Sequence, residues 1–568
     1  MHIHIVPNRG ASPTVLLRES YREGASVRKR TLANLSGLPM AQIEAIRSVL
    51  RGVAICPVAQ CFEITATRAH GHVEAVAAAM QRLGFASLIA SKPCRERDLV
   101  AAMVASRILA PAAKLATTRW WHTTTLAEDF GVTDASEDDL YDAMDWLLKR
   151  QDAIQKKLAT RHLSAGGLVL YDLSSSYFEG STCPLARLGY SRDGKRGTLQ
   201  VNYGLLTDAR GCPVAISVHE GNVSDSKTFM PEVQRLREDF GIEQMVMVGD
   251  RGMISRKAIN EMRQTDGWGW ITALKSVSIR ALVEQKHLQP DLFDERNLLE
   301  LSSADYPGER LVACRNVELA KLRAHKREAL LAATEVNLAK VKVRVDAARL
   351  TGKDKIGLQV GKIVNQYKVA KHVELNIGEA SFSFERKHES IAAEALLDGI
   401  YIIRTSVSAD KMNAAACVRN YKSLAMVERA FRSFKGVDLK VRPIHHRLAD
   451  RVRAHLLLCM LAYYVEWHMR EAWRELMFAD CDQLAKTSRD PVAPARRSRA
   501  ALAKIASHTL DDGSAAHSWP TLLAELSTIA RNTCRTPQAE DNAATFNITT
   551  TPTPKQKRAL DLIQAIQM

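Results

Sequence analysis

The run from Leu168 to Leu274 most strongly limits the fold of this 568-residue chain. Three strand-like segments come first, "LVLYD", "LQVNYGLLTD" and "CPVAISVHEG", with a tight Ala-Arg-Gly turn between the second and third. Helix-like and strand-like segments then alternate through "SDSKTFMPEVQRLREDFG", "EQMVMVGD", "SRKAINEMRQ" and "GWITAL". An antiparallel meander followed by alternating units predicts an α/β fold, with a mixed sheet and helices on its faces.

Two of the strand-like segments end on an acid, Asp172 in "LVLYD" and Asp250 in "MVMVGDRGM". A lone aspartate at a strand end is also a common turn or cap residue. If the two strands are parallel neighbours, both carboxylates emerge at the same edge of the sheet, where ligands usually bind. Two oxygen ligands at one point suit Mg²⁺. Proteins typically hold this ion with only a few carboxylates, and substrate phosphate and water complete its octahedral coordination.

A third acid comes from the helix-like stretch "NYKSLAMVERAFRSFKGVDLK". Tyr421, Glu428 and Lys435 follow one another at steps of seven residues, nearly two turns, so they share one face of an ideal helix. Arg432 stands four residues after Glu428 on the same face. The alternative is a solvent-exposed helix with ordinary Glu–Arg pairs. Together with the two strand-end acids, this face favours a phosphodiester reaction at two metal ions about 4 Å apart.

The charge balance points to a polyanionic partner. Lys and Arg outnumber Asp and Glu by 79 to 63, a formal charge of +16, which favours nucleic acid first. Between Arg310 and Lys371, fifteen Lys or Arg stand against five Asp or Glu. This segment is either a solvated helical hairpin or a surface that contacts phosphates. The chain has no G-x-x-x-x-G-K-[ST] loop, so nucleotide hydrolysis is not expected to drive the reaction.

No segment predicts a membrane or secretory protein. "MHIHIVPNRG" lacks a charged stretch followed by an apolar core, and the most apolar run, in "HLLLCMLAYYVEWH", is too short to span a bilayer. Ten cysteines without a C-x-x-C pair favour reduced thiols. Cys56, Cys61, His70 and His72 form the cluster that suggests zinc, but their spacing fits poorly and buried thiols are favoured. We therefore expect a soluble, cytoplasmic protein.

Changes in periodicity predict five segments along the chain. The first begins with the β-like runs "HIHIVP" and "TVLLRESYRE", turns helical after Lys92, and either contacts DNA or only packs. The segments are a mostly helical N-terminal region (1–160), the first part of a catalytic core (161–279), a basic, largely helical insertion (280–398), the second part of the core with the Glu428 helix (399–475), and a helical C-terminal region with a linker (476–568).

Five motifs, in this order, resemble the insertion-sequence transposases of the DDE type, in the large group whose type member is insertion sequence four. They are "YDLSSSYFEG", "GYSRDGKRG", "EGNVSDSKTF", "VGDRGMI" and "YKSLAMVERAFRSFK", and they span about residues 165–470. The resemblance implies a ribonuclease-H-like core with Asp172, Asp250 and Glu428 as the metal-binding catalytic triad and Mg²⁺, or Mn²⁺, as the cofactor. It also implies double-stranded DNA at the element ends and the target as the partner, a dimer on DNA, and action in the bacterial cytoplasm.

The same resemblance implies residues that contact DNA. Family members carry a Y-R-E-K signature on the helix with the glutamate; its Tyr, Glu and Lys positions are kept here, whereas Leu424 stands where the Arg is expected. Arg432 is the better candidate for the missing cation, because Lys422 points elsewhere on an ideal helix. Lys195 and Arg196 in "RDGKRG" either contact DNA or form a basic loop between strands.

The leading hypothesis is a transposase that binds terminal inverted repeats, hydrolyses at the 3′ ends and transfers the strands to a target. Two alternatives stay open. One is a metal-dependent nuclease of the same fold that cleaves without joining, and the other is a DNA-binding protein derived from a transposase whose acids no longer work. Metal-dependent cleavage separates the enzymes from the binding protein, for which salt-sensitive binding alone is expected.

Overall fold

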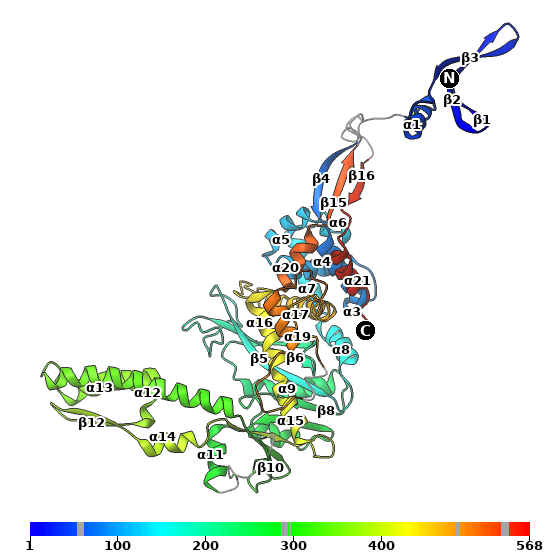
Figure 1. The fold of residues 1–568 in the computed structure, drawn as a ribbon. Coiled ribbons are helices and arrows are strands. Elements are labelled where there is room, and N and C mark those ends of the chain that lie inside the picture. The colour runs from blue at the N-terminus through cyan, green and yellow to red at the C-terminus, as the bar shows by residue number, and fades with distance from the viewer. Residues whose placement is uncertain are drawn as a thin grey trace. The chain divides into compact units, whose positions relative to one another are not determined.

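The computed structural model of the chain describes residues 1–53, 62–285, 288, 293–294, 297–483, 489–535 and 545–567. These residues form two compact units (Figure 1). The smaller contains Met1–Arg68 and Ala530–Thr551, and the larger contains Ala69–Ile529 and Pro552–Met568. All three acids predicted to be catalytic lie in the larger unit.

The described residues of the smaller unit form two small sheets and one helix. The first sheet is a meander with the helix after it: β1 (His2–Asn8), β2 (Ala11–Glu23), β3 (Ser26–Asn34) and α1 (Met40–Leu50). The second combines strands from both ends of the chain: β4 (Glu63–Ala69), β15 (Ala530–Arg535) and β16 (Thr545–Thr549). The runs "HIHIVP" and "TVLLRESYRE" are therefore strands, and the expectation of a mostly helical region 1–160 does not hold for its start.

Short helices between residues 71 and 162 form one layer of the larger unit. They are α2 (Gly71–Arg82), α3 (Phe85–Ile89), α4 (Arg95–Leu109), α5 (Lys114–Trp120), η2 (Trp121–Thr123), α6 (Leu126–Asp129), α7 (Glu137–Leu148) and α8 (Gln151–His162). Helix α7 begins at a capping box, in which the Ser136 backbone N–H donates to Asp139 Oδ2 at 2.8 Å and the Asp139 N–H donates to Ser136 Oγ at 3.3 Å. The residues after Lys92 are helical, as predicted, whereas α2 and α3 come before the point at which helices were expected.

An eight-stranded mixed sheet forms the centre of the larger unit, in the order β10-β11-β14-β9-β8-β5-β6-β7. Its strands are β5 (Leu168–Tyr177), β6 (Gln200–Asp208), β7 (Pro213–Glu220), β8 (Met245–Val248), β9 (Trp268–Ala273), β10 (Leu298–Leu301), β11 (Arg310–Arg315) and β14 (Ile400–Thr405). The pairs β5–β8 and β8–β9 are parallel, and the other pairs are antiparallel. The predicted mixed sheet, with its antiparallel meander at one end, is confirmed.

Helix α17 (Ala449–Ala472) lies between this sheet and the helical layer, in contact with α2, α4, α7 and β7. Every residue from Ala454 to Glu466 is buried, which explains an apolar run without an amphipathic pattern. Among the described residues no single helix is long and apolar enough to cross a membrane. One bent pair, Arg95–Leu109 with Lys114–Thr123, passes that test by length and composition alone.

The other helices of the larger unit flank the sheet or come from the C-terminal region. They are α9 (Asp225–Glu238), α10 (Arg256–Met262), α11 (Ser276–Glu284), α15 (Ala414–Lys422), α16 (Leu424–Arg432), η5 (Ser433–Val437), α19 (Arg499–Ser507), α20 (Trp519–Ser527) and α21 (Pro554–Gln564). Both α20 and α21 pack against α2. Part of the C-terminal region is therefore built into the N-terminal helical layer.

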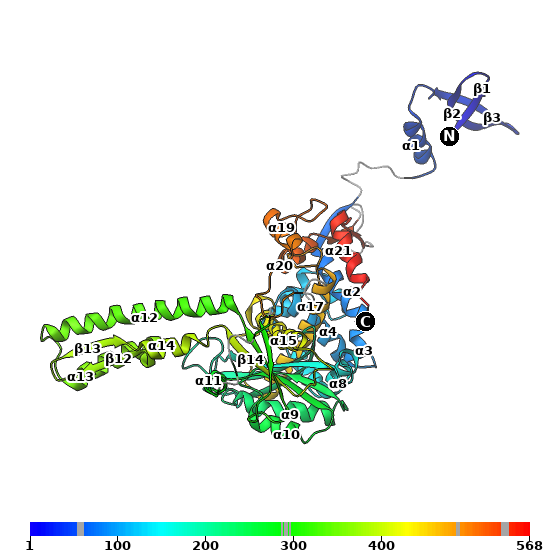
Figure 2. The same ribbon diagram turned by 60° about the horizontal axis from the view of Figure 1, so that its bottom comes forward.

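The segment expected as a basic insertion has two structural parts. Strands β10 and β11 belong to the large sheet, because β11 pairs with β14 along its whole length. The remainder has its own hydrophobic core and places α12 beside α13 (Figure 2). Its elements are α12 (Val317–Asp346), α13 (Lys353–Tyr367), η4 (Ala370–His372), β12 (Val373–Ile377), β13 (Phe382–Arg386) and α14 (His388–Ala395). The inserted part therefore begins at about Val317 and not at residue 280, as had been expected. The count of charged residues did not reveal that "RLVACR" is an apolar strand.

Two glycines of the motifs "GYSRDGKRG" and "EGNVSDSKTF" allow a close approach of backbones. A Cβ on Gly221 would lie 2.0 Å from the Gln200 carbonyl oxygen, and one on Gly189 would lie 2.1 Å from the Gly221 carbonyl oxygen. The Gln200 side chain also donates to the Gly221 carbonyl at 2.9 Å. These contacts hold the loop before β6 against the end of β7.

Gly221→Ala is therefore expected to destabilise the protein by about 2 kcal/mol or more, because a backbone atom has to move to admit the methyl group. Gly361→Ala in α13 is the matched control, since its Cβ would meet nothing within 4 Å, and it is expected to stabilise by up to about 1 kcal/mol. Denaturant midpoints measure both changes. Equal midpoints for the two variants would contradict the close approach at Gly221.

Candidate active site

The parallel pairing of β5 with β8 brings the two predicted aspartates to one edge of the sheet. Leu170 pairs with Val248, and Asp172 and Asp250 each follow two residues later. Strand β5 does not end at Asp172 but continues to Tyr177, because β6 pairs with it from Val169 to Tyr177. The expectation that the strand ends at Asp172 was therefore wrong. The serines 174–176, which follow Asp172, are buried residues of the same strand.

The third acid, Glu428, lies on α16, which packs across β5. The helical path is less regular than an ideal helix: α15 ends at Lys422, α16 begins at Leu424, and a π-helical turn, η5, begins at Ser433. Val427, Ala430 and Phe431 are buried on the inner side of α16, while Glu428 is exposed. The predicted seven-residue spacing therefore extends over three short helical segments.

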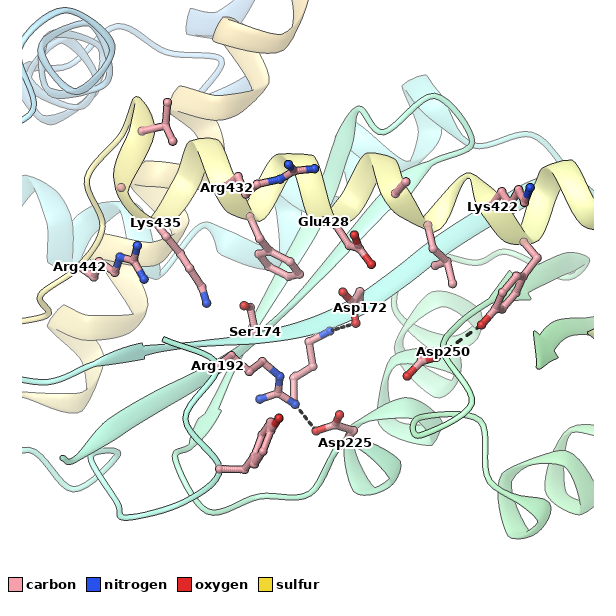
Figure 3. A pocket seen from close by; sticks show the side chains of 18 residues that line it. Asp172, Ser174, Arg192, Asp225, Asp250, Lys422, Glu428, Arg432, Lys435 and Arg442 are labelled. Carbon is pink, nitrogen blue, oxygen red and sulfur yellow. Dashed lines mark hydrogen bonds and ion pairs between the residues drawn. The ribbon is translucent and has the colours of Figure 1, made fainter. Parts of the chain in front are cut away.

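All three acids line one cavity of about 890 Å³. Figure 3 shows Asp172, Asp250 and Glu428 directed into this space, with Glu428 on the helix above the strand that carries Asp172. Basic and aromatic side chains complete its polar wall: Tyr190, Arg192, Tyr421, Lys422, Arg432, Lys435 and Arg442. The cavity thus combines three carboxylates with several cations, an arrangement suited to a phosphate diester and metal ions.

Asp172 is the most enclosed of the three acids. Its Oδ1 accepts a hydrogen bond from the Leu173 backbone N–H at 2.8 Å. Burial, with smaller contributions from the carboxylates of Asp250 and Glu428, raises the pKa of Asp172 to about 7, against the opposing hydrogen bond from Leu173 and the charge of Arg192. A carboxylate under this repulsion is stabilised by any cation that binds between the acids.

In metal-free buffer, Asp172→Asn is expected to raise the melting temperature by about 4 °C at pH near 8. A carboxyl whose pKa rises from 3.8 to about 7 on folding favours the folded state fully below about pH 4, and this contribution is lost as pH rises through about 7. The amide side chain of the variant does not ionise, so the variant does not lose this stability. Its melting temperature relative to that of the unmutated protein therefore rises between about pH 4 and pH 7. Thermal unfolding with a chelator measures the difference, and an advantage independent of pH would contradict the raised pKa.

Tyr421 is held beside the second aspartate. Its hydroxyl donates to Asp250 Oδ1 at 3.5 Å. Burial, followed by the negative charge of Asp250, raises the pKa of the Tyr421 phenol well above its usual value. The phenol is therefore a neutral hydrogen-bond donor that orients the Asp250 carboxylate.

Lys435 is held in a buried ion pair at the wall of the cavity. Its Nζ donates to Asp193 Oδ1 at 3.0 Å, and an Arg442 guanidinium N–H donates to the same oxygen at 2.6 Å. The Tyr177 backbone N–H donates to Asp193 Oδ2 at 3.0 Å. The Asp193 side chain is only 2% exposed. A contact of Lys435 with DNA stays a prediction, because in the structure its charge is already paired.

The other cations predicted to contact DNA differ in their surroundings. Arg432 is exposed and lines the cavity, and the structure gives it no ion pair within the described parts of the chain. Lys422 instead donates to the carbonyl oxygens of Val492 and Ala493, at 3.1 and 3.3 Å. Lys195 lies 3.6 Å from the centre of the Tyr177 ring. Arg196 is exposed on the same loop.

Sequence reasoning missed several residues of this cavity, although the motifs contained them. Arg192 lies in "GYSRDGKRG" and Asp225 in "EGNVSDSKTF", and the two form an ion pair in the cavity wall (Figure 3). The Arg192 backbone N–H also donates to Ser175 Oγ at 3.0 Å. The signal in the sequence was a basic residue in one motif and an acidic residue in another, both next to strands of the same meander. This signal could have predicted that the two side chains pair.

The three acids fit a hard divalent ion by their donor set, since every ligand they offer is an oxygen and their mutual repulsion calls for a cation. Among the described residues their carboxylates do not already converge as the ligands of a single ion. The expected zinc cluster is only partly described: Cys56 and Cys61 lie outside the described residues, and His70 Nδ1 is 2.8 Å from Thr125 Oγ1.

Comparisons with known proteins give two matching family models. The family model described as the transposase DDE domain matches residues 172–465, more than half of the chain, and the model described as the IS1634 family transposase N-terminal domain matches residues 3–55. No curated protein matches. Among solved structures, the piggyBac transposase synaptic complex with hairpin DNA is similar at 10% identity and a TM-score of 0.32, over 80% of this chain and 77% of that chain.

Proposed function

Because the chain belongs to the family of transposases with a DDE domain, we propose that it binds the terminal inverted repeats of an insertion sequence, hydrolyses the 3′ ends and transfers the strands to a target DNA. The observation that carries this proposal is the position of Asp172, Asp250 and Glu428 around one cavity. We assign the core a ribonuclease-H-like fold. The strand order β7-β6-β5-β8-β9, antiparallel and then parallel, supports that assignment.

In the proposed site, Asp172, Asp250 and Glu428 hold two Mg²⁺ ions, or Mn²⁺ in their place. When bound, the ions supply activation of the attacking water or 3′ hydroxyl and stabilisation of the leaving oxygen. Asp172, on β5, would hold the ions together with Asp250 and Glu428. Tyr421 keeps the Asp250 carboxylate oriented through its hydroxyl. The acids act as ligands, because their oxygens are the donors that hard ions require.

Contacts with DNA come from cations around the cavity and beyond it. Arg432 takes the place of the signature arginine that Leu424 replaces, because its guanidinium group is exposed at the cavity. Lys195, Arg196, Lys435 and Tyr421 are the other proposed contacts. The basic segment around α12 follows the phosphate backbone, and the N-terminal region, with its match to a transposase N-terminal domain, recognises the element ends. Because two ends are joined to one target, we propose a dimer on DNA.

A cleavage assay tests the proposal. The full chain is incubated with double-stranded DNA that carries the inverted repeats flanking its coding region, with Mg²⁺ or Mn²⁺, and 3′ cleavage and strand transfer are expected only with the metal ion. Cleavage without joining would favour a nuclease of the same fold. Salt-sensitive binding without cleavage under any metal would favour a DNA-binding protein derived from a transposase.

A further inference from the structure

Three side chains that commonly bind transition metals meet in the larger unit, outside the cavity of the acids. They are His162 at the end of α8, Cys212 in the turn between β6 and β7, and His468 on α17. Their ligand atoms all lie within 4.8 Å of one another. No other group of three His, Cys, Asp or Glu side chains in the described parts of the chain meets in this way.

We propose that His162, Cys212 and His468 bind one zinc ion, which serves a structural role separate from the catalytic metal ions. Bond lengths of about 2.3 Å to sulfur and 2.0–2.1 Å to nitrogen place the S and N ligands of a tetrahedral site about 3.6 Å apart. The Cys212 Sγ to His468 Nε2 distance is 3.8 Å, close to that requirement. One thiolate and two imidazoles favour zinc over Mg²⁺, which prefers oxygen.

Aromatic neighbours hold the two imidazoles in place. The Tyr464 hydroxyl lies 3.1 Å from His162 Nε2, and the Tyr464 ring lies 4.8 Å from the His468 ring. The Trp467 ring meets His468 at 4.9 Å. Hydrogen-bond partners that orient metal-binding histidines, as the Tyr464 hydroxyl does here, are a regular part of metal sites. Cys212 is fully buried, so water does not compete with the sulfur.

A cavity of about 530 Å³, lined by His162, His468 and Glu471 among others, lies beside these ligands and gives water access to the ion. Water occupies the fourth position of the ion in the proposed site. Arg210 also lines the cavity, but its side chain is bound to Asp208 at 2.9 Å. Arg161 lines the same cavity, and the Glu471 carboxylate there is paired with Arg474.

A zinc ion at this point joins elements that are far apart in the chain. His162 comes from the helical layer, Cys212 from the sheet and His468 from α17, the helix between them. The ion therefore cross-links these three elements of the larger unit. Because such a site does not exist in the unfolded chain, the free energy of zinc binding adds to that of folding.

Metal analysis of the full chain tests the site. After expression with added zinc and removal of loosely bound metal, about one zinc per chain is expected in the unmutated protein and in Asp250→Ala, which changes the catalytic centre only. Cys212→Ser and His468→Ala are expected to lose at least tenfold in zinc content. Cys183→Ser, at another buried free cysteine of the same unit, is the matched control and is expected to keep its zinc.

Cobalt provides a measurement that depends on no variant. Co²⁺ added to the metal-free, unmutated chain is expected to give a thiolate-to-cobalt charge-transfer band, and Zn²⁺ is expected to abolish it. No band together with no bound zinc would overturn the proposal, as would full zinc content in folded Cys212→Ser. Neither result depends on DNA cleavage. The proposal of a zinc site can therefore be rejected without rejecting the proposed transposase activity, and the reverse is also true.

Discussion

Asp172→Asn, Asp250→Asn and Glu428→Gln are each expected to lower the rate of strand cleavage by about 10³-fold or more, with binding to the element ends retained. A 10³-fold loss corresponds to about 4 kcal/mol of transition-state stabilisation. Each substitution keeps the size of the side chain and removes one charged oxygen ligand. Since the metal ions stabilise charge that develops in the transition state, loss of a ligand affects the reaction more than the binding of DNA.

Single-turnover cleavage of end DNA, together with a binding titration, separates these two effects. Asp225→Asn is the matched control because Asp225 lines the same cavity but pairs with Arg192, and we expect it to change the rate by less than about tenfold, as fits a partly exposed ion pair. If all three triad variants cleaved at the full rate, the assignment of the acids would be wrong. Equal losses of binding and cleavage would instead indicate that the acids position the DNA.

The part of the site formed by the sheet could be predicted because strand pairing follows simple rules. Two apolar strand-like segments that end near an acid bring their acids to one edge if they pair as parallel neighbours. The pairing of Leu170 with Val248 has this form. What could not be predicted was how far β5 continues, since "SSSY" has no strong strand pattern and is held by its pairing with β6.

The surroundings of the cations could not be read from the sequence, because they depend on contacts between distant segments. The seven-residue spacing placed Lys435 on the face of Glu428, but its charge is paired with Asp193, more than two hundred residues earlier. Lys422 likewise binds carbonyl groups near residue 492. The insertion boundary was misplaced for a related reason: a net charge describes a surface, whereas the pairing of β11 with β14 decides which strands belong to the sheet.

Asp193→Ala is expected to lower the free energy of unfolding by about 3 kcal/mol, because it leaves the buried Lys435 and the backbone N–H of Tyr177 without their acceptor. Asp134→Ala is the matched control: Asp134 pairs with Arg95 at 3.1 Å, but its side chain is 70% exposed. We expect that change to stay within about 0.5 kcal/mol. Denaturant unfolding of both variants measures the difference.

A double-mutant cycle then decides what Lys435 does. If its main role is the ion pair, Lys435→Met destabilises the protein, and Asp193→Asn combined with Lys435→Met costs less than the sum of the two single changes, by about 1–3 kcal/mol. If Lys435 also neutralises a DNA phosphate, Lys435→Met has a second effect. It reduces the slope of log K for DNA binding against log salt concentration by about one. Asp193→Asn keeps the lysine and should leave that salt dependence nearly unchanged. A cycle without coupling would show that the pair does not hold η5 against the loop that carries Asp193.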